Sequence, residues 1–251
     1  MNYAEYFTNR STDEITRDLI GRPLTFNDGQ EKLGGYIVEA EAYMGKLDRA
    51  AHSYGGHRSP ANEGLYRTGG TIYIYAQRQY FFFDVACQEE NEPQGVLVRA
   101  IDPAWGIDSM IKNRNGKSGV LITNGPAKMM QAFGIHDKNW NLHFLSDSPF
   151  TIDLADNHKR IAQEIIADKR VGINQSDPIW ANKKLRYYVA GNPYVSDMKK
   201  RDYASNNGSW FFLRLLLFLL VAVISLFFRK VSCVLLFPFR FQILLIDLKF
   251  E

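Results

Sequence analysis

Cysteine is scarce in this chain, and its scarcity excludes two kinds of stabilisation. Only two cysteines occur among the 251 residues, Cys87 and Cys233, and they form no C-x-x-C pair. This count argues against a disulfide framework and against a cysteine zinc site. The opening segment, residues 1–21, is polar and charged and lacks the apolar run of a secretory signal. We therefore expect a cytoplasmic protein in a reducing compartment.

An excess of one charge sign is also missing from most of the chain. The formal net charge is +3, and residues 204–251 account for all of it with five basic and two acidic residues. Net charge therefore gives no support for nucleic-acid binding, which would depend on a local basic patch. Hydrophobic residues make up 46% and charged residues 23%, so the composition excludes global disorder and allows one domain of roughly 200 residues.

Long apolar runs are confined to the C-terminal part. Residues 210–228 form a run of 19 that only Arg214 and Ser225 interrupt, which meets the length of about 20 residues for a membrane span. Two interpretations stay open: a membrane anchor, which would tether the protein to a membrane, or a non-native extension. We predict a folded domain over residues 1–203 and a hydrophobic extension over residues 204–251.

Periodicity and turn residues predict alternating strands and helices. The expected helices are Ser11–Gly21, which carries an N-terminal capping signal, Trp105–Asn113, Ala127–Phe133 and Ile161–Asp168. The expected strands are Tyr36–Tyr43, Thr71–Tyr75, Tyr80–Ala86, Gly95–Ile101 and Leu185–Val189. A long connection rich in Gly, Ser, Pro and Asn, residues 44–70, separates the first two strands, and loops of this length are usually functional.

The first two strands gather the residues with chemical potential. Period-2 alternation places Glu39, Glu41 and Tyr43 on one strand face, and it places Tyr73 and Tyr75 together on another. A carboxylate beside tyrosines and a histidine can stack a flat ring and activate a water molecule. The pattern therefore indicates chemistry on a nucleobase.

Four short motifs occur in one order along the chain: EAY at 41–43, AAHS at 50–53, GPAK at 125–128 and GNPYVS at 191–196. Together they resemble the 3-methyladenine DNA glycosylases of the alkyladenine (methylpurine) type, over residues 6–196. The resemblance implies an α+β fold, a single mixed domain with a curved antiparallel sheet flanked by helices. It implies a monofunctional enzyme that flips alkylated or deaminated purines out of double-stranded DNA and hydrolyses the N-glycosidic bond. Such an enzyme needs no cofactor or metal, acts as a monomer and associates with the nucleoid.

The resemblance also assigns roles by position. Glu41 matches the general base, and Tyr43, His52 and Tyr75 match the residues that line the pocket for the flipped base. Arg99 matches an arginine behind the site, where it either supports the catalytic water or a phosphate, or forms a salt bridge with an acid such as Glu41 or Asp84. Lys128 is expected to contact a DNA phosphate. Glu39 has no matching catalytic role, and a basic surface is expected from Arg58, Arg67, Lys183, Lys184 and Arg186.

This sequence departs from the family pattern at two places. The segment AQRQ at residues 76–79 is one residue shorter than usual and lacks the tyrosine that fills the gap left by the flipped nucleotide. Gln77 or Arg78 would have to take that role and contact DNA. Asp84 stands where an asparagine is usual.

The same residues are compatible with two other functions. A metal-dependent hydrolase could use Glu39, Glu41, Asp48 and His52, although their spacing resembles no HExxH motif. Alternatively, the protein binds damaged DNA, or acts at a membrane, without catalysis. Glu41 separates catalysis from this non-catalytic function, because a protein that only binds has no use for an acid beside the pocket.

Overall fold

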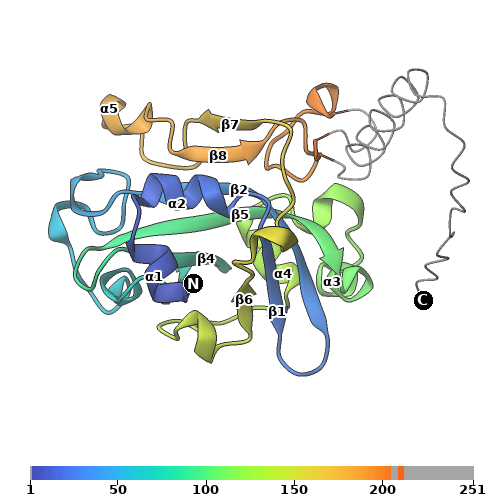
Figure 1. Cartoon of the computed structure of the whole chain (residues 1–251), viewed down its shortest axis with the longest axis horizontal. Coiled ribbons are helices and arrows are strands. Elements are labelled where there is room, and N and C mark those ends of the chain that lie inside the picture. Colours follow the sequence, from blue (N-terminus) through green and yellow to red (C-terminus); the bar gives the residue numbers. More distant parts are fainter. Residues whose placement is uncertain (1, 205–208, 212–251) are drawn as a thin grey trace, which may run out of the picture. The chain divides into compact units, whose positions relative to one another are not determined.

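An eight-stranded antiparallel sheet forms the centre of the fold (Figure 1). The structure is a computed structural model that describes residues 2–204 and 209–211. The strand order is β3-β4-β5-β2-β1-β6, and β8 pairs with both β2 and β7. The strands are β1 (Pro23–Asn27), β2 (Lys32–Tyr43), β3 (Ile72–Gln77), β4 (Tyr80–Cys87), β5 (Gln94–Trp105), β6 (Phe150–Ile152), β7 (Ile165–Asp168) and β8 (Arg186–Val189).

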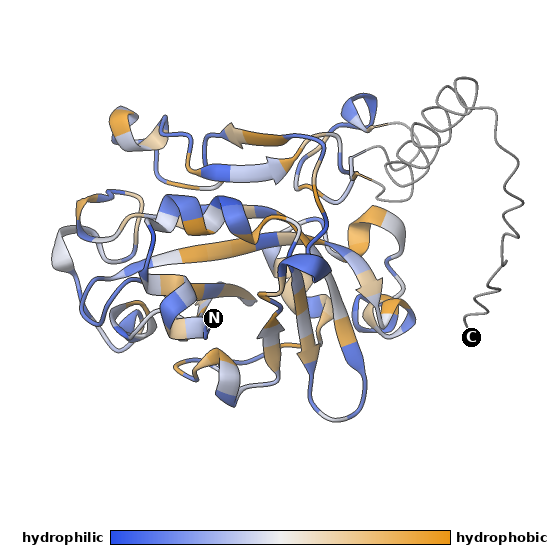
Figure 2. Cartoon of the chain, viewed as in Figure 1, coloured by the Kyte–Doolittle hydropathy of each residue, from blue (hydrophilic) through white to orange (hydrophobic). Residues whose placement is uncertain are grey.

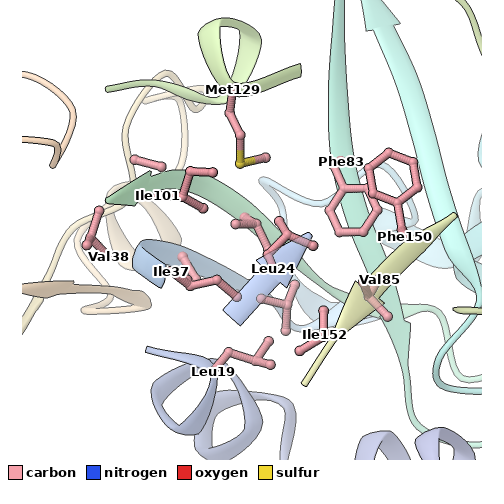
Figure 3. Close-up of a cluster of buried hydrophobic side chains, with 14 of the residues drawn as sticks. Leu19, Leu24, Ile37, Val38, Phe83, Val85, Ile101, Met129, Phe150 and Ile152 are labelled. Carbon is pink, nitrogen blue, oxygen red and sulfur yellow. The ribbon is translucent and has the colours of Figure 1, made fainter. Parts of the chain in front are cut away.

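Most of the short helices contact strands of this sheet. The helices are α1 (Tyr3–Thr8), α2 (Thr12–Leu19), α3 (Ile107–Asn113), α4 (Pro126–Ala132) and α5 (Pro178–Ala181). Helix α2 contacts β2, and α4 contacts β4 and β5. Figure 3 shows Leu19 of α2 and Met129 of α4 on opposite sides of Leu24 and Ile37, and all four side chains are fully buried. The apolar core therefore extends over both faces of the sheet.

Helix α2 shows how the sequence sets a local element. Ser11 and Glu14 form a capping box, in which each side chain accepts a hydrogen bond from the other residue's backbone N–H. Ile15 and Leu19, four residues apart, are buried against β2, while acidic residues occupy the first turn. The predicted helix over residues 11–21 is confirmed.

Two adjacent glycines let β2 pass close to its neighbours. At Gly34, where φ is +156°, an added Cβ would lie 2.4 Å from the backbone oxygen of Leu24, and at Gly35 it would lie 2.1 Å from that of Asp102. The pairing register with β5 shifts between these two residues. Glycines at such an irregularity permit the sheet to curve. The turn between β1 and β2, residues 28–31, is hydrophilic in Figure 2 and exposed.

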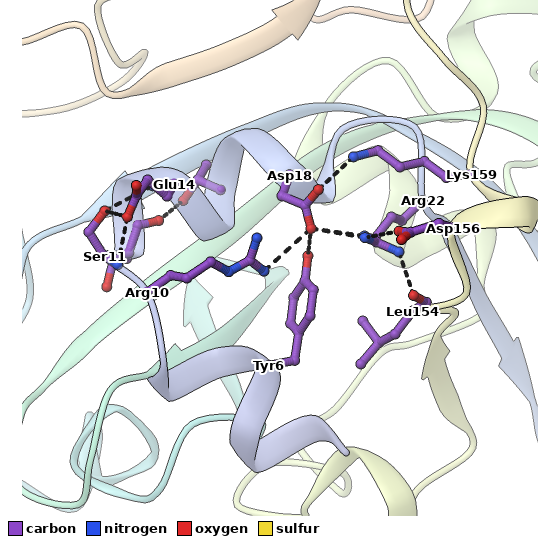
Figure 4. Close-up of polar contacts among 11 residues, drawn as sticks. Tyr6, Arg10, Ser11, Glu14, Asp18, Arg22, Leu154, Asp156 and Lys159 are labelled. Atoms are coloured by element: carbon purple, nitrogen blue, oxygen red, sulfur yellow. Dashed lines mark hydrogen bonds and ion pairs between the residues drawn. The ribbon is translucent and has the colours of Figure 1, made fainter. Parts of the chain in front are cut away.

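A polar cluster ties α1 and α2 to the segment after β6 (Figure 4). Asp18 accepts hydrogen bonds from the Tyr6 hydroxyl at 2.6 Å, from Nη2 of Arg22 at 3.0 Å and from Nζ of Lys159 at 2.7 Å. The Arg22 side chain is nearly buried and also contacts Asp156. None of these five residues lines the cavity beside β2. A substitution in this cluster can therefore serve as a control for substitutions in ion pairs next to that cavity.

The α+β fold class with its curved antiparallel sheet is confirmed, but one predicted element is wrong. Residues 161–168 contain no helix; their second half forms β7, which pairs with β8. Strands β1 and β6 were not predicted. The apolar run after Phe211 lies outside the described residues. Within residues 2–204 and 209–211, no helix is long and apolar enough to cross a membrane.

Candidate active site

A cavity of about 690 Å³ opens beside the C-terminal half of β2. This volume is within the usual range for small-molecule pockets, about 300–1,000 Å³. Its walls come from the end of β2, the connection between β2 and β3, the β3–β4 hairpin, β5 and residues 171–174. The side chains and backbone that line it include Tyr43, His52, Tyr73, Tyr75, Gln77, Phe82, Asp84, Arg99 and Val171.

Glu41 lies directly behind the cavity wall and is completely buried. Its Oε2 accepts a hydrogen bond from the Tyr43 hydroxyl at 3.0 Å, and its Oε1 accepts one from the backbone N–H of Val171 at 2.7 Å. Nη1 of Arg99 lies 3.3 Å from the same Oε1. Each of these three partners lines the cavity. The carboxylate is therefore one residue away from the space that a ligand would fill.

The surroundings of Glu41 act on its charge in opposite directions. Burial raises the pKa of the carboxyl above its ordinary value, and the charge of Glu39 adds to this effect. The Arg99 guanidinium, the Val171 N–H and the Tyr43 hydroxyl lower it, but not enough to cancel the burial. A carboxylate with a raised pKa is a better proton acceptor than an ordinary one, because a general base works best when its pKa approaches the working pH.

Arg99 is held between the two acids of β2. Its Nε donates to Oε1 of Glu39 at 2.9 Å, its Nη1 faces Glu41, and its Nη2 donates to the Ser196 hydroxyl at 3.2 Å. The backbone N–H of Ser196 donates to Glu39 at 2.7 Å. Of the two salt bridges expected for Arg99, the one with Glu41 is present, and no ion pair with Asp84 occurs among the described residues.

Aromatic rings form one wall of the cavity. The Tyr75 ring stacks on the rings of Phe82 and Tyr73, with 4.9 Å and 5.4 Å between ring centres. The His52 ring meets Tyr75 edge-on, with 4.8 Å between ring centres. Nδ1 of His52 and the Tyr73 hydroxyl share a hydrogen bond of 2.9 Å. Burial lowers the pKa of His52, which favours the neutral ring. The predicted set of Tyr43, His52 and Tyr75 therefore lines one cavity.

Gln77 and Arg78, the two candidates to fill the gap left by a flipped nucleotide, lie at the β3–β4 hairpin. Gln77 pairs with Tyr80, so the turn itself is Arg78 and Gln79, and Arg78 adopts a left-handed backbone with φ of +57°. Gln77 lines the cavity, whereas Arg78 is exposed at the tip and does not. The exposed Tyr80 beside this turn offers a large ring at the same edge.

The expected basic surface is partly neutralised by neighbouring acids. Nζ of Lys128 contacts Oδ1 of Asn124 at 2.9 Å and does not line the cavity. Arg58 and Arg67 both pair with Glu63, and Arg186 is buried and pairs with Glu39. These three arginines therefore present less free positive charge than the sequence suggested.

The acids and the histidine considered as a metal site are held apart by other partners. Asp48 pairs with Arg170, and Nδ1 of His52 bonds to Tyr73. In the part of the chain that the structure describes, no group of three or more His, Cys, Asp or Glu side chains is arranged to hold a metal ion.

The chain resembles known proteins over most of its length. The methylpurine-DNA glycosylase family matches residues 6–193. The chain belongs to this family. It is 86% identical to a protein of Lactobacillus helveticus over 208 residues. This stretch is 83% of this chain and 99% of that protein. It is 69% identical to one of Lactobacillus johnsonii with the same coverage, and 41% identical to one of Staphylococcus carnosus over 81% of this chain and 97% of that protein. All three relatives carry the provisional name 3-methyladenine DNA glycosylase.

The part of the chain that matches the methylpurine-DNA glycosylases contains every predicted site residue. Three further residues at the cavity were not assigned a role from sequence: Tyr73, Phe82 and Val171. The first two could have been found, because strand pairing places Tyr75 opposite Phe82 and Tyr73 opposite Asp84. Val171 acts through its backbone N–H, which leaves no signal in the sequence.

Asp84 is the most unusual group in the cavity of this methylpurine-DNA glycosylase family member. It is 5% exposed, and its Oδ1 has no hydrogen-bond partner among the described residues. Burial raises the pKa of Asp84 well above its ordinary value, and the charge of Glu41 raises it further. Folding therefore shifts Asp84 toward its protonated, neutral form relative to the unfolded chain.

Asp84→Asn is expected to have a higher free energy of unfolding than wild type, and this difference should grow as pH increases. A carboxyl whose pKa is raised by folding stabilises the protein fully below its unfolded pKa, about 3.9, and loses this contribution as pH rises through the folded pKa. Wild type and variant should therefore be similarly stable in acid, and the variant should gain about 1.4 kcal/mol for each unit of the raised pKa. Urea unfolding across the pH range measures this difference. Asp108→Asn, at an exposed position, is the control. If the difference in unfolding free energy between Asp84→Asn and wild type does not vary with pH, the expectation is contradicted.

Proposed function

We propose that the protein is a monofunctional purine DNA glycosylase that acts on double-stranded DNA. In this proposal it flips an alkylated or deaminated purine into the cavity, hydrolyses the bond between base and sugar, and leaves an abasic site. Membership of the methylpurine-DNA glycosylase family supports the glycosylase activity. The names of the relatives point to 3-methyladenine as one substrate.

One observation carries the proposal: the Glu41 carboxylate contacts three groups that line an aromatic cavity. As the purine leaves, the C1′–N bond breaks and its electron pair goes to the base, so the sugar becomes cationic. A carboxylate close to C1′ stabilises that positive charge. It also orients a water molecule for attack on C1′ and accepts the proton that the water loses.

The aromatic wall suits a flipped purine. Stacking of a base on an aromatic side chain contributes about 1–3 kcal/mol and tolerates different bases. The rings of Tyr75 and His52 both line the cavity and lie at 88° to each other. Purines alkylated on a ring nitrogen are cationic, and electron-rich tyrosine rings attract cations. Extruding a base costs a few kcal/mol, and less when damage has weakened its pairing, so selectivity arises from both effects.

The burial of Glu41 adds a requirement to the mechanism. Oε2 is capped by the Tyr43 hydroxyl, so the proposal requires this contact to open when the sugar and the water arrive. Catalytic hydrogen bonds commonly rearrange between the free and the substrate-bound enzyme. The contacts of Arg99 with Glu39 and Ser196 do not involve Tyr43, so Arg99 can continue to face the carboxylate.

The test is base release from duplexes that each carry one defined modified purine: 3-methyladenine, 7-methylguanine, hypoxanthine or ethenoadenine. We expect the full chain to release at least one of these bases as the free base. The DNA strand should break only after alkaline treatment, and a strong chelator should not change the rate. No release from any modified duplex would refute the glycosylase assignment, and strand cleavage without alkali would refute the monofunctional mechanism.

A further inference from the structure

A buried ion pair lies beside Glu41 and joins two segments that are far apart in sequence. Nη1 of Arg170 lies 2.5 Å from Oδ2 of Asp48, and Nη2 lies 2.8 Å from Oδ1. Both side chains are completely buried. This two-pronged contact fixes the orientation of the guanidinium as well as its position.

The Arg170 end of the pair contacts the backbone and the ring next to Glu41. Nη1 of Arg170 also donates to the backbone oxygen of Ala42 at 3.0 Å, and its guanidinium lies 4.7 Å from the centre of the Tyr43 ring. The next residue along the chain is Val171, whose N–H binds Oε1 of Glu41. One arginine therefore holds the strand that carries Glu41, the tyrosine that caps Oε2 and the backbone that binds Oε1.

The Asp48 end organises the connection that leads to His52. Oδ2 of Asp48 accepts a hydrogen bond from the backbone N–H of Met44, and Oδ1 accepts one from that of Ala50, both at 3.0 Å. Ala50 and His52 line the cavity. The ion pair thus connects three parts of the wall: the end of β2, residues 44–52 and residues 170–174.

We propose that Arg170 and Asp48 form a positioning pair, which holds the Val171 N–H on the Glu41 carboxylate and the Tyr43 ring beside it. This inference rests on the proposed function, because it assigns the pair a role in placing the general base. Neither residue would touch a base bound in the cavity, because neither lines the cavity.

The arrangement is not the one that stability alone would favour. Nε of Arg170 is buried and has no hydrogen-bond partner among residues 2–204 and 209–211. Replacing a buried ion pair with apolar side chains is often neutral or stabilising, so burial of a pair is weak evidence for a stabilising role. A role in placing neighbouring groups accounts for the number of backbone contacts that both side chains make.

The pair should also act on the pH dependence of the reaction. The charged and titratable groups around Glu41 are Glu39, Tyr43, Tyr75, Asp84 and Arg99. The Val171 N–H and the Tyr43 hydroxyl both lower the pKa of Glu41. The Val171 N–H is the donor that stays in place when the Tyr43 contact opens. If the pair is disturbed and this N–H moves away, the pKa of Glu41 rises. Because the base must be ionised, the acid limb of the rate profile then moves to higher pH.

Arg170→Lys in the full chain tests the proposal, because lysine keeps the charge and loses the planar fork. We expect the single-turnover rate of base release to fall about a hundredfold at neutral pH, as for a catalytic group misplaced by about 1 Å. Binding to the same modified duplex should change less than about threefold, and the acid limb should move up by about one pH unit. Asp48→Asn should act in the same direction.

Asp18→Asn is the matched control, since it also removes a carboxylate that pairs with a nearly buried arginine, Arg22. This variant should keep the wild-type rate and acid limb. A folded Arg170→Lys protein with an unmoved acid limb would overturn the positioning role, whatever its rate. If Arg170→Lys and Asp48→Asn both fail to fold, the pair belongs to the stability of the fold and the proposal is overturned. Absence of base release by the wild type would instead refute the proposed function.

Discussion

Glu41→Gln is expected to slow base release by about 10²–10⁴-fold, the usual contribution of a positioned general base. Binding to a duplex with the same modified purine should stay within a few-fold of wild type. Glutamine has the size of glutamate and keeps an oxygen that can accept from the Val171 N–H. It lacks the negative charge that stabilises the cationic sugar, and it cannot take the proton from water.

The contacts around Arg99 explain why this variant should still fold. Removing one partner of a buried ion pair is strongly destabilising when the other charge is left alone. Arg99 keeps Glu39 at 2.9 Å and the Ser196 hydroxyl at 3.2 Å when the charge of Glu41 is lost. The loss of rate can therefore be separated from a loss of structure.

Single-turnover base release and duplex binding, measured on the same protein preparation, check this expectation. Glu92→Gln makes the same chemical change at an exposed pair with Lys46, and it should leave both quantities unchanged. Normal excision by Glu41→Gln would show that another group acts as the base. Equal loss of binding and release would favour a structural role for Glu41 in forming the cavity.

The sequence predicted the strands that carry the site because their alternation is local. Glu39 and Glu41 were expected on one face of a strand, and both carboxylates meet the same guanidinium, that of Arg99. Residues 161–168 were assigned wrongly, because the apolar pattern of a segment of eight residues does not distinguish a short helix from a strand. Their strand conformation depends on pairing with β8, about twenty residues later in the chain, and on packing that only the folded protein supplies.

The side chains that line the candidate site could be predicted from the sequence, but the groups that hold Glu41 in place could not. Tyr43, His52 and Tyr75 were recognisable from motifs and do line one cavity. The groups that fix Glu41 come from distant segments: Val171 contributes a backbone N–H, and Arg170 reaches Asp48 across 122 positions. Backbone donors and contacts at such separation have no periodic pattern, so sequence reasoning alone had no means to find them.

The C-terminal boundary of the domain has consequences for any shortened protein. The compact unit extends to Phe211, beyond the boundary predicted after residue 203. Trp210 is 6% exposed, its Nε1 donates to Oδ2 of Asp102 at 2.8 Å, and its ring lies 6.5 Å from that of Tyr36. The backbone N–H of Phe211 donates to the oxygen of Ile161 at 2.8 Å. We therefore propose that the folded domain needs residues up to 211.

A chain ended after residue 203 is expected to be less stable than one ended after residue 211 by about 3–5 kcal/mol, the cost of removing a buried tryptophan side chain. Urea unfolding of the two chains measures this difference. In the longer chain, Trp210→Ala should reproduce most of the loss. Phe211→Ala should change stability by about 0.5 kcal/mol or less, because Phe211 is 50% exposed. Equal unfolding midpoints for the two chains would show that the Trp210 contacts add nothing to the fold, and would place the boundary back at residue 203.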